Sequence, residues 1–315
     1  MPETLPTNAT RIAVVIPAYN ASAYIAETIE SVLNQSRLAD EIVVVNDGST
    51  DNTAEIANGI NPAVTVIHQN NAGQGKARQR GAEATSADFL LFLDADDILH
   101  ASALEKLSAA LAGNPAAGAA YCLAEIWSPD GIIQLQPDNL SRPDGENLWS
   151  ALLCRNFIRT SGCVLIRRTA LNEAGGWDCH ARLQGSEDWE LWLRLSEKFS
   201  FVLVAEPLLR YRSQAGFSKK FRHRMFKGMF NMYRKQRCRW GHDRRRKLAI
   251  DAAEWTNCKS VIAETQNYVR SACSRGLILK AVSRLFAVVP MVMLPIINQG
   301  FNSVMSRMVR RQGVV

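Results

Sequence analysis

Four short apolar runs in the first hundred residues predict β-strands. Residues 12–16, 41–45, 63–67 and 89–93 are β-branched or uniformly apolar, and none of them alternates apolar with polar positions. A strand that faces water on one side alternates in this way, whereas a parallel strand covered on both faces is apolar throughout. We therefore expect these four runs to form parallel strands that are buried on both sides.

The segments between these runs have the period of amphipathic helices. Helices are expected over residues 22–34, 51–59, 75–84 and 101–112. Ser102 and Glu105 match a capping box at the start of the last helix. Strands and helices that alternate in this order form a doubly wound α/β sheet, whose ligands bind at the carboxyl ends of the strands.

A polar cluster follows each of the four predicted strands. The clusters are PAYN at 17–20, NDGSTD at 46–51, QNNAGQGKAR at 69–78 and DADD at 94–97. The carboxyl ends of neighbouring parallel strands meet at one edge of a sheet. Four such loops therefore predict one binding site more readily than four independent helix caps.

The last cluster places three carboxylates, Asp94, Asp96 and Asp97, directly after a buried strand. That much charge must be solvated, used to cap a helix, or neutralised by a cation. Carboxylate oxygens in Asp-x-Asp spacing suit Mg²⁺ or Mn²⁺ bound together with phosphates. A motif this short is weak evidence for a metal site when it stands alone.

The order and spacing of these motifs resemble the family 2 glycosyltransferases. The resemblance runs from residue 12 to about 212, through VVIPAYN, EIVVVNDGSTD, NAGQGKARQRGAE and FLLFLDADD. It implies an α/β domain of the GT-A type, with a Rossmann-like, mostly parallel sheet flanked by helices. We expect this domain to span residues 1–217 and a basic, helical extension to follow over 218–315.

The resemblance also implies a binding site for a nucleotide-sugar donor. Its residues would be Pro17, Ala18, Tyr19, Asn20, Asp47, Lys76, Asp94 and Ala95. Asp47 is expected on the base or ribose, with an ordinary Asp-Gly turn as the alternative. Lys76 or Arg78 could neutralise phosphate, or both could be solvated cations at a helix start. Asp96, with Asp94, would hold a divalent cation, Mn²⁺ or Mg²⁺, against the diphosphate of the donor.

A basic residue on a flexible loop over the diphosphate is a further expectation from the family. Arg210 or Arg212, in LLRYRSQAGFS, stands at that place. The histidine that is more usual in this stretch is absent, which weakens the assignment.

The stretch GSEDWELWLRL predicts an amphipathic helix. Its buried face would begin at Asp188, with Glu187, Glu190 and Arg194 pointing away from that face. The Glu-Asp motif of the family implies that Asp188 is the general base that deprotonates the acceptor hydroxyl. Glu187 is expected beside the acceptor, or alternatively as an acid that complements the helix macrodipole.

The preceding segment, residues 161–178, resembles the acceptor side of the family's site. Trp177 and Asp178 would belong to a sugar-binding wall, in which Trp177 presents a flat apolar surface. The alternative places Trp177 in the core.

The C-terminal third has a different composition. Residues 219–247 contain thirteen Lys or Arg and one acid, Asp243, and the apolar run at 285–297 is too short to span a bilayer. One face of 301–309 is apolar beside three arginines. These segments would suit an anionic membrane surface, with a helical subdomain packed on the protein as the alternative.

Composition supports a globular intracellular protein. The chain is 47% hydrophobic and 21% charged, its seven cysteines form no CxxC pair, and its first residues lack a signal-peptide pattern. We expect a cytoplasmic location, with possible attachment to the inner face of the cell membrane.

The function expected from the sequence is inverting, metal-dependent transfer of a sugar in cell-envelope glycan synthesis. The donor would be a nucleoside-diphosphate sugar, with UDP as the first choice, and the acceptor would be a hydroxyl of a polysaccharide or a lipid-linked glycan. A nucleotidyltransferase is one alternative, although no Gly-rich triphosphate loop follows the first strand. A non-catalytic polyanion-binding protein acting through 219–247 is another. The acids at 94–97 and 187–188 argue against it, and nucleic acid is not an expected partner.

Overall fold

The computed structural model describes residues 10–128, 131, 133–135, 148–180, 183, 185–213 and 217–274. The chain divides into two compact units. The first unit contains Met1–Leu152 and Asn156–Lys219, and the second contains Leu153–Arg155 and Lys220–Val315. The apolar segments at 285–297 and 301–309, for which membrane contact is predicted, lie outside the described residues.

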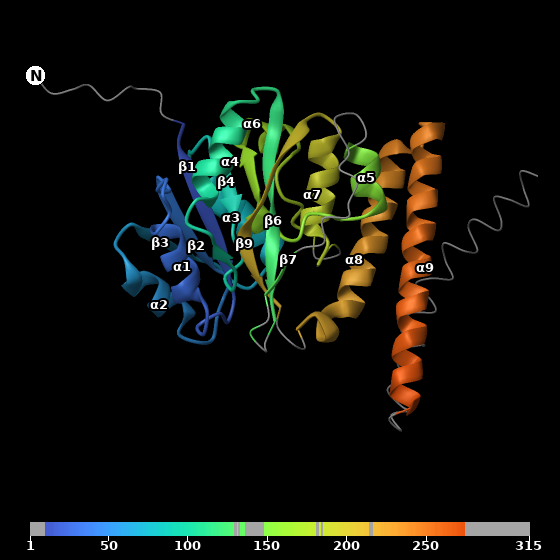
Figure 1. Ribbon diagram of the computed structural model, residues 1–315, viewed down its shortest axis with the longest axis horizontal. Helices are drawn as coiled ribbons and strands as arrows, with labels where there is room; N and C mark the ends of the chain where they lie inside the picture. Colours follow the sequence, from blue (N-terminus) through green and yellow to red (C-terminus); the bar gives the residue numbers. More distant parts are fainter. Residues whose placement is uncertain are drawn as a thin grey trace, which may run out of the picture. The chain divides into compact units, whose positions relative to one another are not determined.

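A mixed β-sheet flanked by helices forms the first unit (Figure 1). In the described residues its order is β3-β2-β1-β4-β8-β6-β9-β5, and β7 pairs with β6. The strands are β1 (Ile12–Ala18), β2 (Glu41–Asn46), β3 (Val64–His68), β4 (Phe89–Phe92), β5 (Ile98–Leu99), β6 (Ala117–Trp127), β7 (Ile133–Leu135), β8 (Val164–Arg167) and β9 (Ser200–Arg212).

The four strands predicted from apolar runs are present, and they pair in parallel in the order β3-β2-β1-β4. β1 and β4 are buried along their whole length, as expected for strands covered on both faces. β3 differs, because Val64 is buried whereas Thr65 is exposed. The prediction of complete burial is wrong for β3, which lies at the edge of the sheet.

Beyond β4 the sheet becomes mixed. β8 pairs antiparallel with both β4 and β6, and β9 then runs parallel to β6. The short β5 pairs antiparallel with β9, with Ile98 opposite Arg210. These pairings bring the end of β9 next to the acidic cluster that follows β4.

Seven α-helices of the described chain lie wholly or mostly in the first unit. They are α1 (Ile25–Leu33), α2 (Thr53–Ile60), α3 (Gln74–Glu83), α4 (Ala103–Ala112), α5 (Leu148–Cys154), α6 (Arg168–Glu173) and α7 (Glu187–Ser196), and a 3₁₀ turn, η2, covers Ser161–Cys163. The first four confirm the predicted helices. The predicted capping box is wrong: Ser102 occupies the N-cap without a side-chain cap bond, and Glu105 instead accepts a hydrogen bond from Ser36 Oγ at 2.5 Å.

Helix α3 lies very close to the sheet at Gly81. An ideal Cβ at this position would lie 2.2 Å from Val15 Cγ1 and 3.1 Å from Val45 Cγ2. These distances are shorter than van der Waals contact. The missing side chain therefore lets α3 pack directly on β1 and β2, and this fixes the end of the helix that precedes β4.

Two long helices, α8 (Phe217–Trp240) and α9 (Arg244–Ser274), make up most of the described second unit. Arg237 joins them through ion pairs with Asp251, at 2.8 Å, and with Glu254. Tyr233 Oη donates a hydrogen bond of 2.7 Å to the carbonyl of Leu153. Among the helices of the described residues, none is long and apolar enough to cross a membrane.

Candidate active site

The ends of β1 and β2 are tied together by side-chain hydrogen bonds. Pro17 and Ala18 belong to β1 and are buried, whereas Tyr19 is 52% exposed. Asn20 has a left-handed backbone with φ of 48°, and its side-chain oxygen accepts a 2.8 Å hydrogen bond from Thr50 N. The structure thus places the predicted residues of this loop at the carboxyl edge of the sheet.

Asp47 has a structural role that the sequence does not reveal. Its carboxylate is buried and accepts hydrogen bonds from Gln69 Nε2 at 2.7 Å, Ala72 N at 2.8 Å and Gly73 N at 2.9 Å. Both oxygens are therefore used to hold the loop between β3 and α3. In this arrangement Asp47 positions the rim of the site, and the expected contact with a base or ribose stays a prediction.

The two cations at the start of α3 have different surroundings. Lys76 is exposed, whereas Arg78 is 4% exposed and forms an ion pair with Asp94 at 2.6 Å. The Arg78 guanidinium also lies 4.9 Å from the centre of the Trp177 ring. Burial alone would lower the pKa of Arg78, but the charges of Asp94, Glu187 and Asp188 outweigh it and raise the pKa.

The acidic cluster after β4 is crowded with negative charge. Asp94 accepts a 2.7 Å hydrogen bond from Thr160 Oγ1 in addition to its ion pair, and Asp96 is half-buried. Asp97 is fully buried, and its Oδ1 accepts a 3.1 Å hydrogen bond from Arg212 N. Burial, followed by the charges of Asp94 and Asp96, raises the pKa of Asp97 well above its ordinary value.

This cluster fits a divalent cation that is shared with a ligand. In the described chain, no three His, Cys, Asp or Glu residues are grouped so that they could hold an ion by themselves. Magnesium-like ions commonly use one or two carboxylates and complete their coordination with substrate phosphates and water. Arg78 neutralises Asp94, and the pKa of Asp97 is raised, so a cation would mainly balance the charge of Asp96. Asp96, half-buried in the turn after β4, could hold such an ion.

The prediction of a flexible loop carrying Arg210 and Arg212 is wrong. Both residues belong to β9, because this strand continues along β6 as far as the pair Trp127 and Arg212. Arg210 pairs with Glu125 at 3.3 Å. Arg212 pairs with Glu27 at 2.5 Å, and its Nε donates a 3.0 Å hydrogen bond to the carbonyl of Asp96. Arg212 thus supports the acidic turn from the side of β9.

Trp177 lies in the core. Its side chain is 3% exposed and makes edge contacts with Phe92 and Trp192, with ring centres 5.0 Å and 6.2 Å apart. It therefore presents no flat surface to a sugar. The prediction that Trp177 belongs to a sugar-binding wall is wrong, and the alternative, a place in the core, is correct. Asp178 is half-buried, and its Oδ1 accepts hydrogen bonds from His180 N at 2.8 Å and His180 Nδ1 at 2.7 Å.

Asp188 stands in the first turn of α7 and is half-buried. Its Oδ1 accepts a 2.7 Å hydrogen bond from Trp189 N. Burial raises the pKa of Asp188 to about 6, against the opposing effect of the Arg78 charge. A carboxylate with this pKa is suited to accept a proton near neutral pH. Burial also raises the pKa of Glu187, whose Oε2 accepts a 2.7 Å hydrogen bond from Gly185 N.

The predicted exposed face of α7 is wrong. Glu187, Glu190 and Arg194 are all buried, and Glu190 is only 1% exposed. Glu190 and Arg194 form an ion pair one helical turn apart, with Nη2 and Oε2 at 2.7 Å. A pair of opposite charges with several hydrogen bonds can be buried where a single charge cannot.

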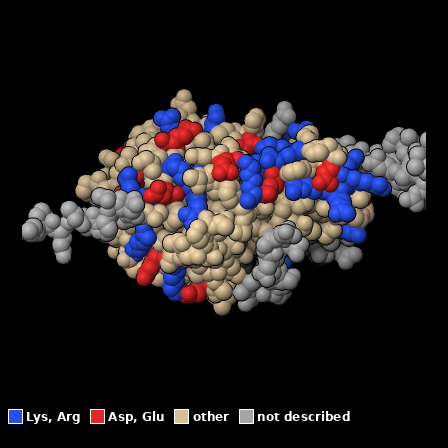
Figure 2. Space-filling view, turned by 90° about the horizontal axis from the view of Figure 1, so that it is seen from above, with Lys and Arg blue, Asp and Glu red and all other residues tan. Residues whose placement is uncertain are grey.

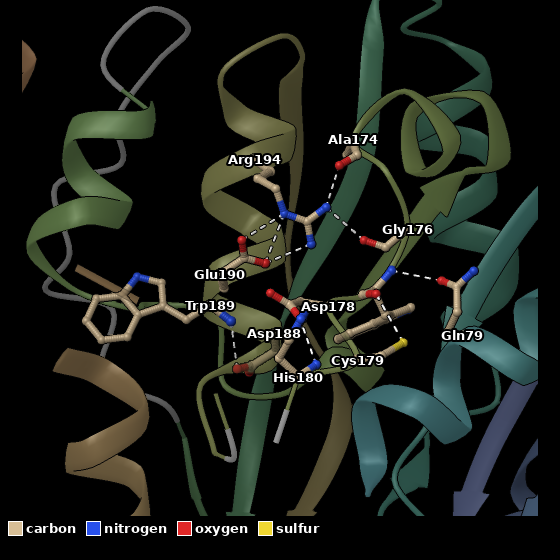
Figure 3. A network of polar contacts seen from close by, with 11 residues as sticks. Gln79, Ala174, Gly176, Asp178, Cys179, His180, Asp188, Trp189, Glu190 and Arg194 are labelled. Carbon is tan, nitrogen blue, oxygen red and sulfur yellow. Dashed lines mark hydrogen bonds and ion pairs between the residues drawn. The ribbon is translucent and has the colours of Figure 1, made fainter. Parts of the chain in front are cut away.

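Arg194 connects α7 to the segment before Asp178 (Figure 3). Its Nη1 donates to the carbonyl of Ala174 and, at 2.8 Å, to that of Gly176. From the other side, Gln79 Oε1 on α3 accepts a 2.9 Å hydrogen bond from Trp177 N. Gly176 has φ of 71°, and a Cβ there would lie 2.5 Å from Gln79 Oε1. Two helices therefore hold this turn, and only glycine fits at its tightest point.

Arg78 is the residue that joins the two halves of this arrangement. It forms an ion pair with Asp94 on the side of β4, and the charges of Glu187 and Asp188 on α7 act on it as well. Asp94 after β4 and the two acids at the start of α7 therefore interact electrostatically with the same arginine. The sequence named Lys76 or Arg78 as a partner for phosphate, with two solvated cations as the alternative, and the structure buries Arg78 and exposes Lys76.

Comparison with known proteins agrees with this geometry. Residues 13–175, just over half of the chain, match the model described as glycosyl transferase family 2. The chain belongs to glycosyl transferase family 2. This membership confirms the resemblance found in the sequence motifs, and the acids at 94–97 lie inside the matched range.

Two relatives of this family 2 chain show different extents of similarity. The amylovoran biosynthesis glycosyltransferase AmsB of Erwinia amylovora is 30% identical over 224 residues, which cover 66% of this chain and 71% of AmsB. The chondroitin synthase of Pasteurella multocida is 28% identical over 193 residues, 60% of this chain. The chain spans only 19% of that synthase.

Solved structures show the same fold. The mannosyltransferase PcManGT of Pyrobaculum calidifontis, in complex with GDP-Man and Mn²⁺, has a TM-score of 0.59 at 18% identity, covering 91% of this chain and 88% of its own. TarS of S. aureus (residues 1–349), in complex with UDP, has a TM-score of 0.52 at 19% identity, covering 71% and 65%. The family 2 chain thus has the predicted α/β fold of the GT-A type.

Proposed function

We propose that this family 2 chain transfers a sugar from a nucleoside-diphosphate donor to a hydroxyl group of a glycan, with inversion at the anomeric carbon. The observation that carries the proposal is the pairing of the acidic cluster after β4 with Asp188, a carboxylate whose pKa is raised to about 6. The charges of Asp94 and Asp188 both act on Arg78. The acidic cluster suits a cation and a diphosphate, and Asp188 suits the role of proton acceptor.

Asp188 is proposed to accept the proton of the acceptor hydroxyl as the oxygen attacks the anomeric carbon. The bond between that carbon and the diphosphate breaks in the same displacement, on the opposite face of the sugar. Asp96 would hold Mn²⁺ or Mg²⁺, which, when bound, stabilises the negative charge that develops on the departing diphosphate. Arg212 supports the Asp96 carbonyl, and Arg78 keeps Asp94 in place.

Two observations support a nucleotide-sugar donor: the residues at the carboxyl edge of the sheet, and the ligands of similar structures. Tyr19 is exposed and Asn20 is fixed at the end of β1, which suits recognition of a nucleotide above the strands. Similar structures were solved with UDP, UDP-GlcNAc and GDP-Man. UDP-sugars remain the first choice. The relatives described as an amylovoran biosynthesis glycosyltransferase and a chondroitin synthase support a polysaccharide acceptor, and a lipid-linked glycan is the alternative.

Nucleotide binding measured by thermal shift tests the proposal most directly. UDP, GDP and dTDP would each be added to the wild type and to Asp96→Asn, with and without Mn²⁺. One nucleotide should stabilise the wild type only when Mn²⁺ is present. At about 100 times its dissociation constant the stabilisation should be about 2.7 kcal/mol, which is several degrees in Tm.

The matched control is Glu55→Gln, which removes an exposed charge on α2 away from the acidic cluster. This variant should bind the same nucleotide as tightly as the wild type. The donor site is refuted if no nucleotide stabilises the wild type under any metal condition. Equal stabilisation of the wild type and Asp96→Asn would instead remove Asp96 from the proposed role.

A further inference from the structure

Exposed cations gather where α8 ends and α9 begins. We name this surface the basic turn. Its exposed members are Arg234, Lys235, Arg239, Arg244, Arg245 and Lys247. Figure 2 looks from above onto the end where this turn lies in Figure 1, and it shows Lys and Arg side chains grouped there with few acids among them.

The helical period brings some of these cations together. Lys235 and Arg239 lie one turn apart on α8, Arg234 precedes Lys235, and Arg244 and Arg245 begin α9. Residues four positions apart on a helix are neighbours. Leu248, which is 61% exposed, therefore lies beside Arg244 on the same side of α9. The surface combines several positive charges with an exposed aliphatic side chain.

The basic turn is held in shape by other residues of the same unit. Arg237 is engaged in its ion pairs with Asp251 and Glu254, which join α8 to α9. The Arg246 guanidinium lies 3.6 Å from the centre of the Trp240 ring. The sole acid of the stretch, Asp243, accepts hydrogen bonds from Arg245 N at 2.9 Å and Arg246 N at 3.1 Å. These contacts hold the turn between α8 and α9, and the cations named above are exposed at its surface.

The details favour a bilayer over a nucleic acid as the anionic partner. Sites for single-stranded nucleic acid combine cations with open aromatic rings on which bases stack. Here the Trp240 ring is half-buried and lies against Arg246. An exposed leucine beside arginines instead suits the boundary between lipid headgroups and acyl chains.

We propose that the basic turn docks this protein onto an anionic membrane surface. The exposed cations would bind headgroup phosphates, and Leu248 would enter the headgroup region. This site is in the second unit and does not depend on the donor chemistry proposed for the first.

Vesicle co-sedimentation of the full chain tests this inference. The vesicles would contain phosphatidylglycerol with phosphatidylcholine, or phosphatidylcholine alone. The variant carries Arg244→Glu and Arg245→Glu, because the helix macrodipole favours acids in the first turn, so α9 should stay helical. We expect the ratio of bound to free protein on anionic vesicles to fall about tenfold or more. Wild-type binding should also weaken as salt rises from about 0.1 M to 0.5 M.

The matched control makes the same change in net charge elsewhere, with Arg80→Glu and Lys198→Glu on exposed positions of the first unit. It should bind anionic vesicles like the wild type. Either of two vesicle results would overturn the proposal: equal binding by the Arg244/Arg245 variant and the wild type, or an equal loss in both double variants. Binding of wild type to a short RNA but not to anionic vesicles would assign the surface to nucleic acid and would also overturn it. Thermal shift with nucleotide should be unchanged throughout, which separates this test from that of the donor site.

Discussion

Asp188 combines two properties that usually exclude each other. It carries an ionisable group, and it is buried enough that its pKa rises to about 6. The charge of Arg78 limits this rise, so the carboxylate is still largely ionised at neutral pH. A base with this pKa holds a proton well enough to accept it and weakly enough to release it again.

Replacement of Asp188 by asparagine should strongly slow turnover without loss of donor binding. The amide keeps the shape of the side chain but cannot accept the proton of the acceptor hydroxyl. We expect the transfer rate to fall by roughly 10²- to 10⁴-fold. The nucleotide-induced thermal shift should stay within error of the wild type. A large loss of nucleotide binding would assign Asp188 to the donor site instead.

The same substitution should increase stability near neutral pH. The folded-state pKa of Asp188, about 6, lies above the ordinary value of 3.8 for an aspartate, so the folded state binds the proton more tightly. The stability that protonated Asp188 contributes to the folded state is fully present below about pH 3.8 and is lost as pH rises through about 6. Asp188→Asn should therefore be more stable than the wild type at pH 7.5, by at most about 3 kcal/mol.

Urea unfolding at pH values from 4 to 7.5 measures this difference. The stability of the variant relative to wild type should grow as pH rises through about 6. Glu55→Gln, on an exposed position of α2, should follow the wild type at every pH. A constant difference between Asp188→Asn and the wild type would contradict a raised pKa at this position.

At the scale of elements, α3 connects the sheet to the site. Gly81 allows it to lie against β1 and β2, Arg78 reaches Asp94, and Gln79 holds the backbone of Trp177. A shift of this helix would displace both the acidic cluster and the segment before α7. The helix is therefore a structural part of the proposed site even where it binds no ligand.

Gly81→Ala should disturb this packing. The added methyl group would meet Val15 Cγ1 at 2.2 Å, on a fully buried strand that cannot easily move. Overpacking of this kind costs about 1–3 kcal/mol. The matched control is Gly59→Ala in α2, where an added Cβ meets nothing within 4 Å. That substitution should stabilise the protein by about 0.5–1 kcal/mol. Urea unfolding measures both changes in the free energy of unfolding. Equal changes for Gly81→Ala and Gly59→Ala would contradict the packing described for α3.

Elements were predictable from the sequence where local pattern and burial coincide. β1 and β4 are buried on both faces, so their composition alone identifies them as core strands. The acids after β4 and the Glu-Asp motif were found because the family keeps them in order along the chain. β3 was misjudged because its position at the sheet edge depends on the order of all the strands.

The remaining errors have a common cause in partners that are distant in sequence. β9 extends to Arg212 through its pairing with β6. Glu190 and Arg194 looked like solvent-exposed residues of α7, but the carbonyls of Ala174 and Gly176 complete their hydrogen bonding in the core. Contacts of this kind are set by the tertiary fold, and no helical period reveals them.

At the scale of the whole molecule, the second unit has stabilising contacts of its own. Within the second unit, Arg237 pairs with Asp251 and with the buried Glu254. Removal of one partner of a buried ion pair leaves an uncompensated charge and can cost about 3–5 kcal/mol, although partial exposure of Arg237 should reduce this effect.

Arg237→Ala should therefore loosen the second unit and leave the donor site of the first unchanged. We expect faster hydrogen exchange in α8 and α9, and a nucleotide-induced thermal shift equal to that of the wild type. Arg234→Ala, which removes an exposed cation one helical turn away, is the matched control and should exchange like the wild type. Loss of nucleotide binding in Arg237→Ala alone would show that the units depend on each other.

The hydrogen bonds that Asp47 accepts from residues 69–73 also affect the thermodynamics of ligand association. The backbone of this loop is fixed as part of folding, through Ala72 N and Gly73 N. The loss of its conformational entropy is thus included in the free energy of folding. A donor that binds beside it does not have to order this part of the rim, so more of its contact energy is expressed as affinity.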